Sequence, residues 1–137
     1  MSWANEQFPL SLSRYVGSCA ANAEQEIALG RFPNNGARLL RVAFYPDGDI
    51  ETDTTSGFAF HLLNKGTAGT VNTTIATYTA TTAAATLSKY KELALTFSTA
   101  SGAQAVTEDQ YLTWKETTIG TGTARANGVV RVEYTLV

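Results

Sequence analysis

Short runs of alternating apolar and polar residues make up most of the chain, and this period of two is typical of half-buried β-strands. The clearest run is 130–136, where Val, Tyr and Leu alternate with Arg, Glu and Thr. Further runs of alternating or strand-forming residues lie at 24–29, 39–45, 58–62, 71–78, 93–97 and 111–114. The many threonines of 71–78 favour a pleated surface over a helix, because their side chains are β-branched. The pattern predicts roughly seven or eight strands.

Turn-forming residues separate these runs. Asp47-Gly48 is a strong tight-turn signal, and Asn64-Lys65-Gly66 and Gly120-Thr121-Gly122 have similar turn chemistry. Short helices fit at two places, the alanine-rich residues 82–87 and the stretch before Lys91, although a loop or a single turn fits there equally well. Strands joined by frequent turns, without a tandem repeat, predict an all-β fold, a two-layer β-sandwich or jelly-roll-like domain.

The N-terminal stretch differs from the rest of the chain. Its large apolar residues, which follow neither a helical nor a strand period, are Trp3, Phe8, Leu10, Tyr15 and Val16. Such a segment either lies loosely over its own domain, as chain ends commonly do, or docks its aromatic residues on a neighbouring subunit. We therefore divide the chain into an extended N-terminal arm, residues 1–23, and a β-sandwich domain, residues 24–137.

Length and charge limit the classes of function. The chain has 137 residues, enough for one hydrophobic core but too few for two ordinary domains. Charged residues make up 16%, and the formal net charge is −2, without the basic patch that nucleic-acid binding needs. No apolar run approaches the roughly 18 residues of a membrane span, and the N-terminus lacks the basic start and apolar block of a secretory signal. We expect neither a nucleic-acid partner nor a membrane partner.

Groups suited to catalysis are scarce in this sequence. The single cysteine, Cys19, excludes an internal disulfide and a cysteine-based zinc site. The single histidine, His61, alternates with Phe60 and Leu62, which places it on the polar side of a strand. We interpret His61 as a polar strand residue and Cys19 as a small packing residue, not as a base and its nucleophile. The sequence indicates a protein that is not an enzyme and needs no cofactor.

Acidic and glycine-rich stretches offer three further candidates for chemistry. Four carboxylates alternate within residues 47–53 and would supply oxygen ligands, but the run lacks the closing glutamate and flanking helices of the known calcium loop. A solvated hairpin turn is the alternative, and we expect no metal site there. Glu108-Asp109 are neighbours in a predicted turn, unlike a glycosidase pair. The glycines of 120–123 lack the lysine and the helix of a phosphate loop.

Two questions stay open from the strand pattern. Trp114, Tyr111 and Tyr78 stack on sugars if they are exposed and fill the core if they are buried, and the pattern fits both. The final strand either is central in a sheet or has its edge covered by assembly, since a weakly charged β protein risks edge-to-edge association. The alternation of Arg131 with Glu133 favours a strand with one solvated face.

The turn and strand motifs also occur in a distinctive order. In the sequence they are Leu29–Pro33, Ala37–Val42, Tyr45-Pro46, Leu62–Thr70, Ile119–Gly122 and Gly128–Val132. This order, over about residues 24–137, resembles that of the β domain of head decoration (cement) proteins from tailed bacteriophages.

The resemblance implies a structural virion protein on the outside of an icosahedral capsid, made in the host cytoplasm. It implies a homotrimer at threefold or quasi-threefold positions, with the phage major capsid protein as its partner. The anchors expected on the arm are Trp3, Phe8, Leu10 and Tyr15, since aromatic residues dominate interface energies. A carbohydrate-binding or receptor-recognition sandwich, and a tail or fibre component, remain alternative functions.

Overall fold

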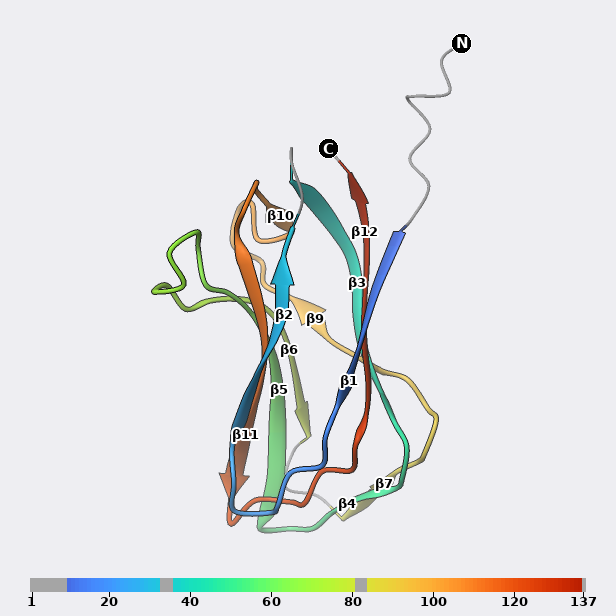
Figure 1. The fold of residues 1–137 in the computed structure, drawn as a ribbon. Helices are drawn as coiled ribbons and strands as arrows, with labels where there is room; N and C mark the ends of the chain where they lie inside the picture. The colour runs from blue at the N-terminus through green and yellow to red at the C-terminus, as the bar shows by residue number, and fades with distance from the viewer. Residues whose placement is uncertain (1–9, 33–35, 81–83, 137) are drawn as a thin grey trace.

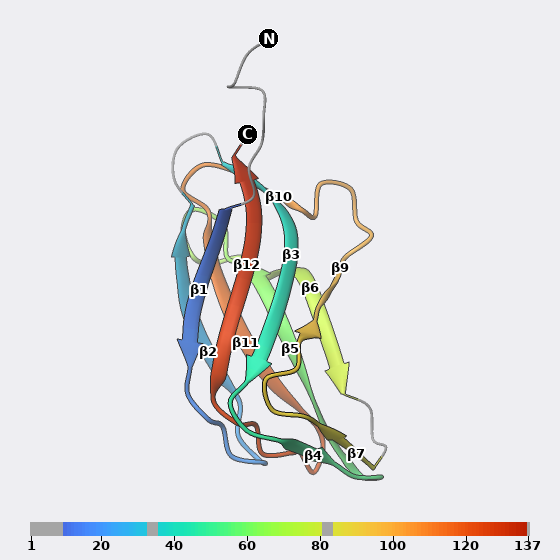
Figure 2. The ribbon, with the colours of Figure 1, turned by 90° about the vertical axis from the view of Figure 1, so that its right-hand side faces the viewer.

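The computed structural model describes residues 10–32, 36–80 and 84–136. In this part of the chain all regular elements are β-strands, arranged as two five-stranded antiparallel sheets and one two-stranded sheet (Figure 1). The two large sheets face each other as the layers of a sandwich (Figures 1 and 2). The predicted all-β sandwich is confirmed.

The first sheet contains the two ends of the described chain. Its strands are β1 (Leu10–Val16), β12 (Gly128–Leu136), β3 (Ala37–Pro46), β8 (Leu93–Ala94) and β10 (Ala105–Val106). Strand β12 lies between β1 and β3, and the short β8 and β10 both pair with β3. The final strand is therefore central in its sheet, which is the first of the two options that the sequence left open.

The second sheet has β2 at one edge and β9 at the other. Its order is β2 (Gln25–Arg31), β11 (Tyr111–Gly120), β5 (Ser56–Asn64), β6 (Thr73–Ala80) and β9 (Thr96–Phe97). A separate small sheet joins β4 (Ile50–Thr52) to β7 (Ala85–Leu87) at one end of the sandwich (Figure 1).

The core lies between the two large sheets and is rich in aromatic rings. Phe44 of the first sheet packs on Phe60 and Trp114 of the second, with ring centroids 4.8 and 5.9 Å away. Val130 and Val132 fill the same layer from β12. Burying each such side chain contributes about 1.5–3 kcal/mol, so these contacts hold the layers together.

Of the two options that the sequence left open for Trp114, the structure shows the second: the side chain fills the core, and none of it is exposed. Tyr78 is half-buried and packs against the core. Tyr111 is half-buried under the guanidinium of Arg31, whose central carbon lies 5.5 Å from the ring centroid. The aromatic residues suspected of sugar binding serve mainly to pack the sandwich.

Three local predictions differ from the structure. Residues 10–16, expected to lack regular structure, form strand β1 along β12. Asp47-Gly48 is a bend, but it leads from the first sheet into the small sheet and does not close a hairpin. Residues 85–87, where a short helix was one option, form β7, because β4 provides a partner strand. Tertiary pairing decides all three.

Candidate functional site

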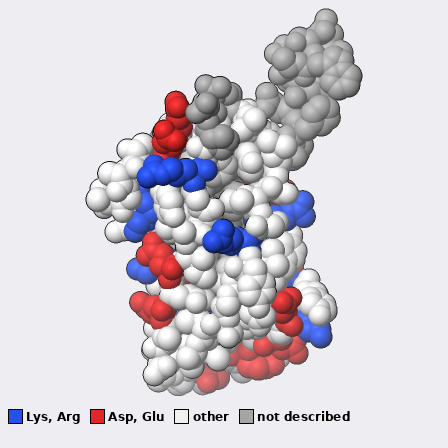
Figure 3. Space-filling view, in the orientation of Figure 1, with Lys and Arg blue, Asp and Glu red and all other residues white. Residues whose placement is uncertain are grey.

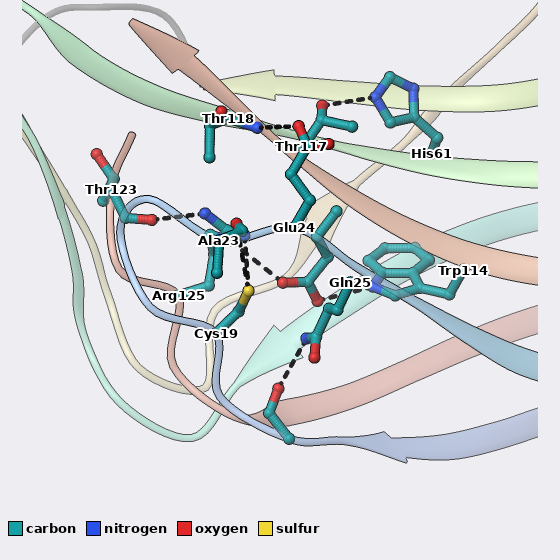
Figure 4. A network of polar contacts seen from close by, with 12 residues as sticks. Cys19, Ala23, Glu24, Gln25, His61, Trp114, Thr117, Thr118, Thr123 and Arg125 are labelled. Atoms are coloured by element: carbon teal, nitrogen blue, oxygen red, sulfur yellow. Dashed lines mark hydrogen bonds and ion pairs between the residues drawn. The ribbon is translucent and has the colours of Figure 1, made fainter. Parts of the chain in front are cut away.

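Two polar constellations stand out: a buried ion pair near the β1–β2 connection and a groove on the outer face of the second sheet. The buried pair joins Arg125 Nε to Glu116 Oε1 at 3.3 Å, and neither side chain is exposed by more than 1% (Figure 4). Glu116 also accepts a hydrogen bond of 3.0 Å from Trp114 Nε1. The sequence contains a signal for this buried acid, which sequence reasoning missed. Glu116 follows Leu112 and Trp114 on the inward face of β11, so it is a charged residue in an otherwise apolar series.

Arg125 ties the β1–β2 connection to the turn before β12. Its guanidinium donates to the Ala23 carbonyl at 2.6 Å, to Cys19 Sγ at 2.9 Å and to the Thr123 carbonyl at 2.9 Å (Figure 4). The backbones of Cys19 and Arg125 exchange two further hydrogen bonds of 3.0 and 2.8 Å. Gly122 lies in the same turn at φ 80°, and a Cβ there would overlap the Ala21 carbonyl. The contacts form a clamp, defined here as Cys19, Ala23, Glu116, Thr123 and Arg125.

The clamp is closed to ligands. Burial is the main cause that raises the pKa of the Cys19 thiol, and it outweighs the neighbouring Arg125 charge, which lowers that pKa. A raised pKa keeps the sulfur as an unreactive thiol near neutral pH. In the described residues no buried side-chain nitrogen or oxygen lacks a hydrogen-bond partner. We therefore assign the clamp a structural role.

The groove lies on the solvent side of β5, β6 and β11. His61 Nε2 and Thr117 Oγ1 are 3.0 Å apart (Figure 4). Lys115 is directly opposite His61 in the β5–β11 register. Burial lowers the pKa of His61, the adjacent Lys115 lowers it further, and Glu24 acts in the opposite direction. The placement of His61 on the polar side of its strand is confirmed, and its ring is neutral near pH 7.

Two glutamates of the β2 region border this face and are already engaged. Glu26 Oε2 accepts from Thr113 Oγ1 at 2.7 Å and pairs with Lys65 Nζ at 3.2 Å. The hydrogen bond from Thr113 is the main cause that lowers the pKa of Glu26. Glu24 Oε2 accepts from the Thr118 backbone at 3.2 Å. Both carboxylates therefore serve contacts between β2 or its entrance and the neighbouring strands.

The acidic run 47–53 does not converge on one point. Asp49 accepts from the Lys89 backbone, Glu51 from the Thr86 hydroxyl, and Asp53 from Thr55. Figure 3 shows acidic side chains at the lower end of the molecule, near the small sheet. Among residues 10–32, 36–80 and 84–136, no three histidine, cysteine or carboxylate side chains could hold one metal ion together.

The predicted partner-binding residues fall in two groups. Trp3 and Phe8 lie outside the described residues. Leu10 and Tyr15 lie on β1 and are 41% and 60% exposed. Because side chains alternate along a strand, Leu10 and Tyr15 project on opposite faces of the first sheet, and the structure does not bring them into one patch.

Strand β1 also has a free edge. In the described part of the chain it pairs with β12 alone, over seven residues and without a register shift. It contains no proline and one charged residue, Arg14. Such an edge offers unpaired backbone groups to another extended chain.

Comparison of the chain with protein-family models, curated proteins and solved structures gives no match. Across the described residues there is no helix with the length and apolar character needed to cross a membrane.

Proposed function

We propose that this chain is a structural protein that binds the outside of a bacteriophage capsid, as a head decoration protein does. The observation that carries the proposal is the free, regular edge of β1 with Leu10 and Tyr15 exposed along it. An extended segment of a capsid protein that pairs with this edge would contact both faces of the first sheet. Side chains on both faces, Leu10 on one and Tyr15 on the other, would then contribute to binding.

The packing of the rest of the described molecule supports a rigid body that acts by binding. The aromatic core is filled from both sheets, and the clamp fixes the connection that leads from β1 to β2. A rigid body loses little conformational freedom when it binds. On the face that Figure 3 shows, few charged side chains interrupt the surface, and wide uncharged areas separate them.

Repetition on a capsid would strengthen weak individual contacts. If three copies assemble around a threefold position, binding of the first raises the effective concentration of the others at neighbouring sites. A single strand-edge contact can then be weak while the assembled trimer is held firmly. The trimer is part of the proposal, and light scattering of the purified protein with and without capsids tests it.

The decisive experiment mixes the purified chain with expanded, undecorated capsids of its phage. We expect the chain to cosediment with the capsids and to raise their disruption temperature. Tyr15→Ala removes exposed aromatic surface from the β1 edge and should weaken binding about tenfold. Tyr90→Ala is the matched control, because Tyr90 is 67% exposed but its loop is hydrogen bonded to Pro46 of β3, and β12 separates β3 from β1. No cosedimentation of the unsubstituted chain, or equal binding losses in both variants, would refute the proposal.

A further inference from the structure

The groove beside His61 has the size of a small-ligand site. Its volume is about 320 Å³, and its wall consists of His61, Leu63, Asn72, Thr74, Lys115 and Thr117. Ligand pockets in proteins begin at about 300 Å³, which suits a molecule the size of one sugar ring. The wall residues come from β5, β11 and β6 with the residue before β6, so the floor is a sheet and is rigid.

Lys115 is the available positive charge of the groove. The described part of the chain gives its half-buried side chain neither a hydrogen bond nor an ion pair. The nearby Glu26 is paired with Lys65 and bonded to Thr113, and Glu24 accepts from the Thr118 backbone. Lys65, the second lysine of this region, is neutralised by Glu26 and donates to Asn72 Oδ1. Lys115 also acts electrostatically on Glu26, its cross-strand neighbour on β2. Since it makes no hydrogen bond or ion pair with that carboxylate, its ammonium group favours one negative charge in the ligand.

The other wall groups are neutral and suited to hydroxyl groups. His61 is uncharged near pH 7, since burial and Lys115 lower its pKa and the opposing effect of Glu24 is smaller. Thr74 is exposed, and the amide nitrogen of Asn72 stays available because Lys65 occupies only the amide oxygen. Leu63 also lines the groove, but only 6% of it is exposed, so it offers a ligand little apolar surface. A phosphate dianion would need a second positive charge, which this wall does not supply.

We propose that this groove binds a sugar carboxylate of one ring, a hexuronic acid in chemical class, with its carboxylate on Lys115. The hydroxyls of the ring then hydrogen bond with Thr74, Thr117 and Asn72. This site is independent of capsid binding, because it lies on the second sheet while β1 belongs to the first. The two proposals therefore fail separately.

Nuclear magnetic resonance of His61 gives a direct test, since it is the single histidine of the chain and its ring signal needs no assignment. The probes are sodium glucuronate, glucose and sodium acetate, which separate the carboxylate from the hydroxylated ring. We expect glucuronate to shift the His61 signal saturably at about millimolar concentration, and to raise the pKa of His61 by placing a negative charge near it. Glucose and acetate should bind at least about tenfold more weakly.

Variants connect that signal to the groove. Lys115→Gln should weaken glucuronate binding about tenfold or more, whereas Lys91→Gln, on an exposed loop, should leave it unchanged. Thr74→Val is a second groove variant, which keeps the test valid if Lys115→Gln fails to fold. It removes one exposed hydroxyl and should weaken glucuronate binding several-fold. Absence of saturation by glucuronate overturns the proposal, as does acetate binding of equal strength or unchanged binding in both groove variants.

Discussion

The edge strands β1 and β2 lie on the same side of the sandwich, each seven residues long, yet their edges differ in protection (Figure 2). Strand β2 contains Glu26, ends at Arg31 and includes Gly30 at φ 119°. Its pairing with β11 shifts register between Leu112 and Thr113. Strand β1 has an unbroken register and a single charge at Arg14. The same chain thus protects the β2 edge against pairing and leaves the β1 edge regular and nearly uncharged.

This contrast matters because an exposed sheet edge invites pairing with another chain. Charges, glycines and register irregularities make such pairing unfavourable, and β2 has all three. The described residues give β1 no comparable device except Arg14. We infer that β1 is the edge suited to a partner, whereas β2 is protected as a surface that remains in solvent.

The largest expected effect comes from breaking the clamp that fixes the connection between the two strands. Arg125→Met leaves Glu116 buried without its cation and should cost about 3–5 kcal/mol of unfolding free energy in urea titrations. Hydrogen exchange should accelerate in both β1 and β2, because their shared connection is released.

Two further variants sharpen that result. Arg131→Met breaks an exposed pair with Glu133, 3.5 Å apart, and should cost at most about 1 kcal/mol. Adding Glu116→Gln to Arg125→Met should recover part of the lost stability by removing the isolated charge. Equal losses from Arg125→Met and Arg131→Met would contradict the structural role of the clamp.

The next largest effect is expected from two substitutions that convert β1 into a protected edge. Ser11 is opposite Glu133 and Ser13 is opposite Arg131, so Ser11→Lys with Ser13→Glu creates two favourable cross-strand pairs. Stability should stay within about 1 kcal/mol, while cosedimentation with capsids should weaken at least about tenfold, since charges on an edge oppose strand addition.

The reversed charges provide a matched control for stability. Ser11→Glu with Ser13→Lys places like charges opposite each other and should be less stable than the first double variant by about 0.5–2 kcal/mol for the two positions. Thr79→Lys, exposed on β6, should leave capsid binding unchanged. Undiminished capsid binding by both β1 double variants would show that this edge is not the contact.

A smaller effect should follow from removing protection at β2. Glu26→Thr removes the charge beside Lys65 and makes that edge more favourable for pairing. We expect self-association that rises a few-fold at high protein concentration in sedimentation velocity. Glu51→Thr removes an exposed glutamate from the small sheet and should sediment as the unsubstituted chain does. Identical sedimentation of the two variants would contradict a protective role of Glu26.

The smallest effect is the pH dependence that His61 contributes. Its pKa is lower in the folded chain than the ordinary 6.5, so the unfolded state takes up protons first as the pH falls. This contribution to stability is complete above pH 6.5 and decreases below it, until the folded-state pKa is reached. His61→Gln should flatten the decrease in melting temperature between about pH 7 and pH 5. A decrease of the same size in the variant would exclude His61 as its source.

The candidate sites show where sequence reasoning succeeded and where it stopped. The alternation around His61 placed the ring on the solvent side of β5, which the structure confirms. Strand β1 was missed because Arg14 interrupts its apolar positions and Tyr15 its polar positions, although Leu10 to Ser13 alternate. Pairing with β12 supplies the stability that the local pattern lacks. Arg125 gave no sequence signal, since it lies outside the alternating runs and its contacts with Cys19 and Ala23 join segments that are distant in the chain.

The sequence by itself determined the all-β class, the inward rows of Phe58, Phe60 and Leu62, and the positions of the main turns. These features depend on local alternation and on backbone preferences, which neighbouring residues set. Tertiary structure alone decided that Trp114 fills the core, that β12 is central and that β1 has a free edge. Strand order and edge exposure arise from pairing between distant segments, and a period of two is the same in a central strand and in an edge strand.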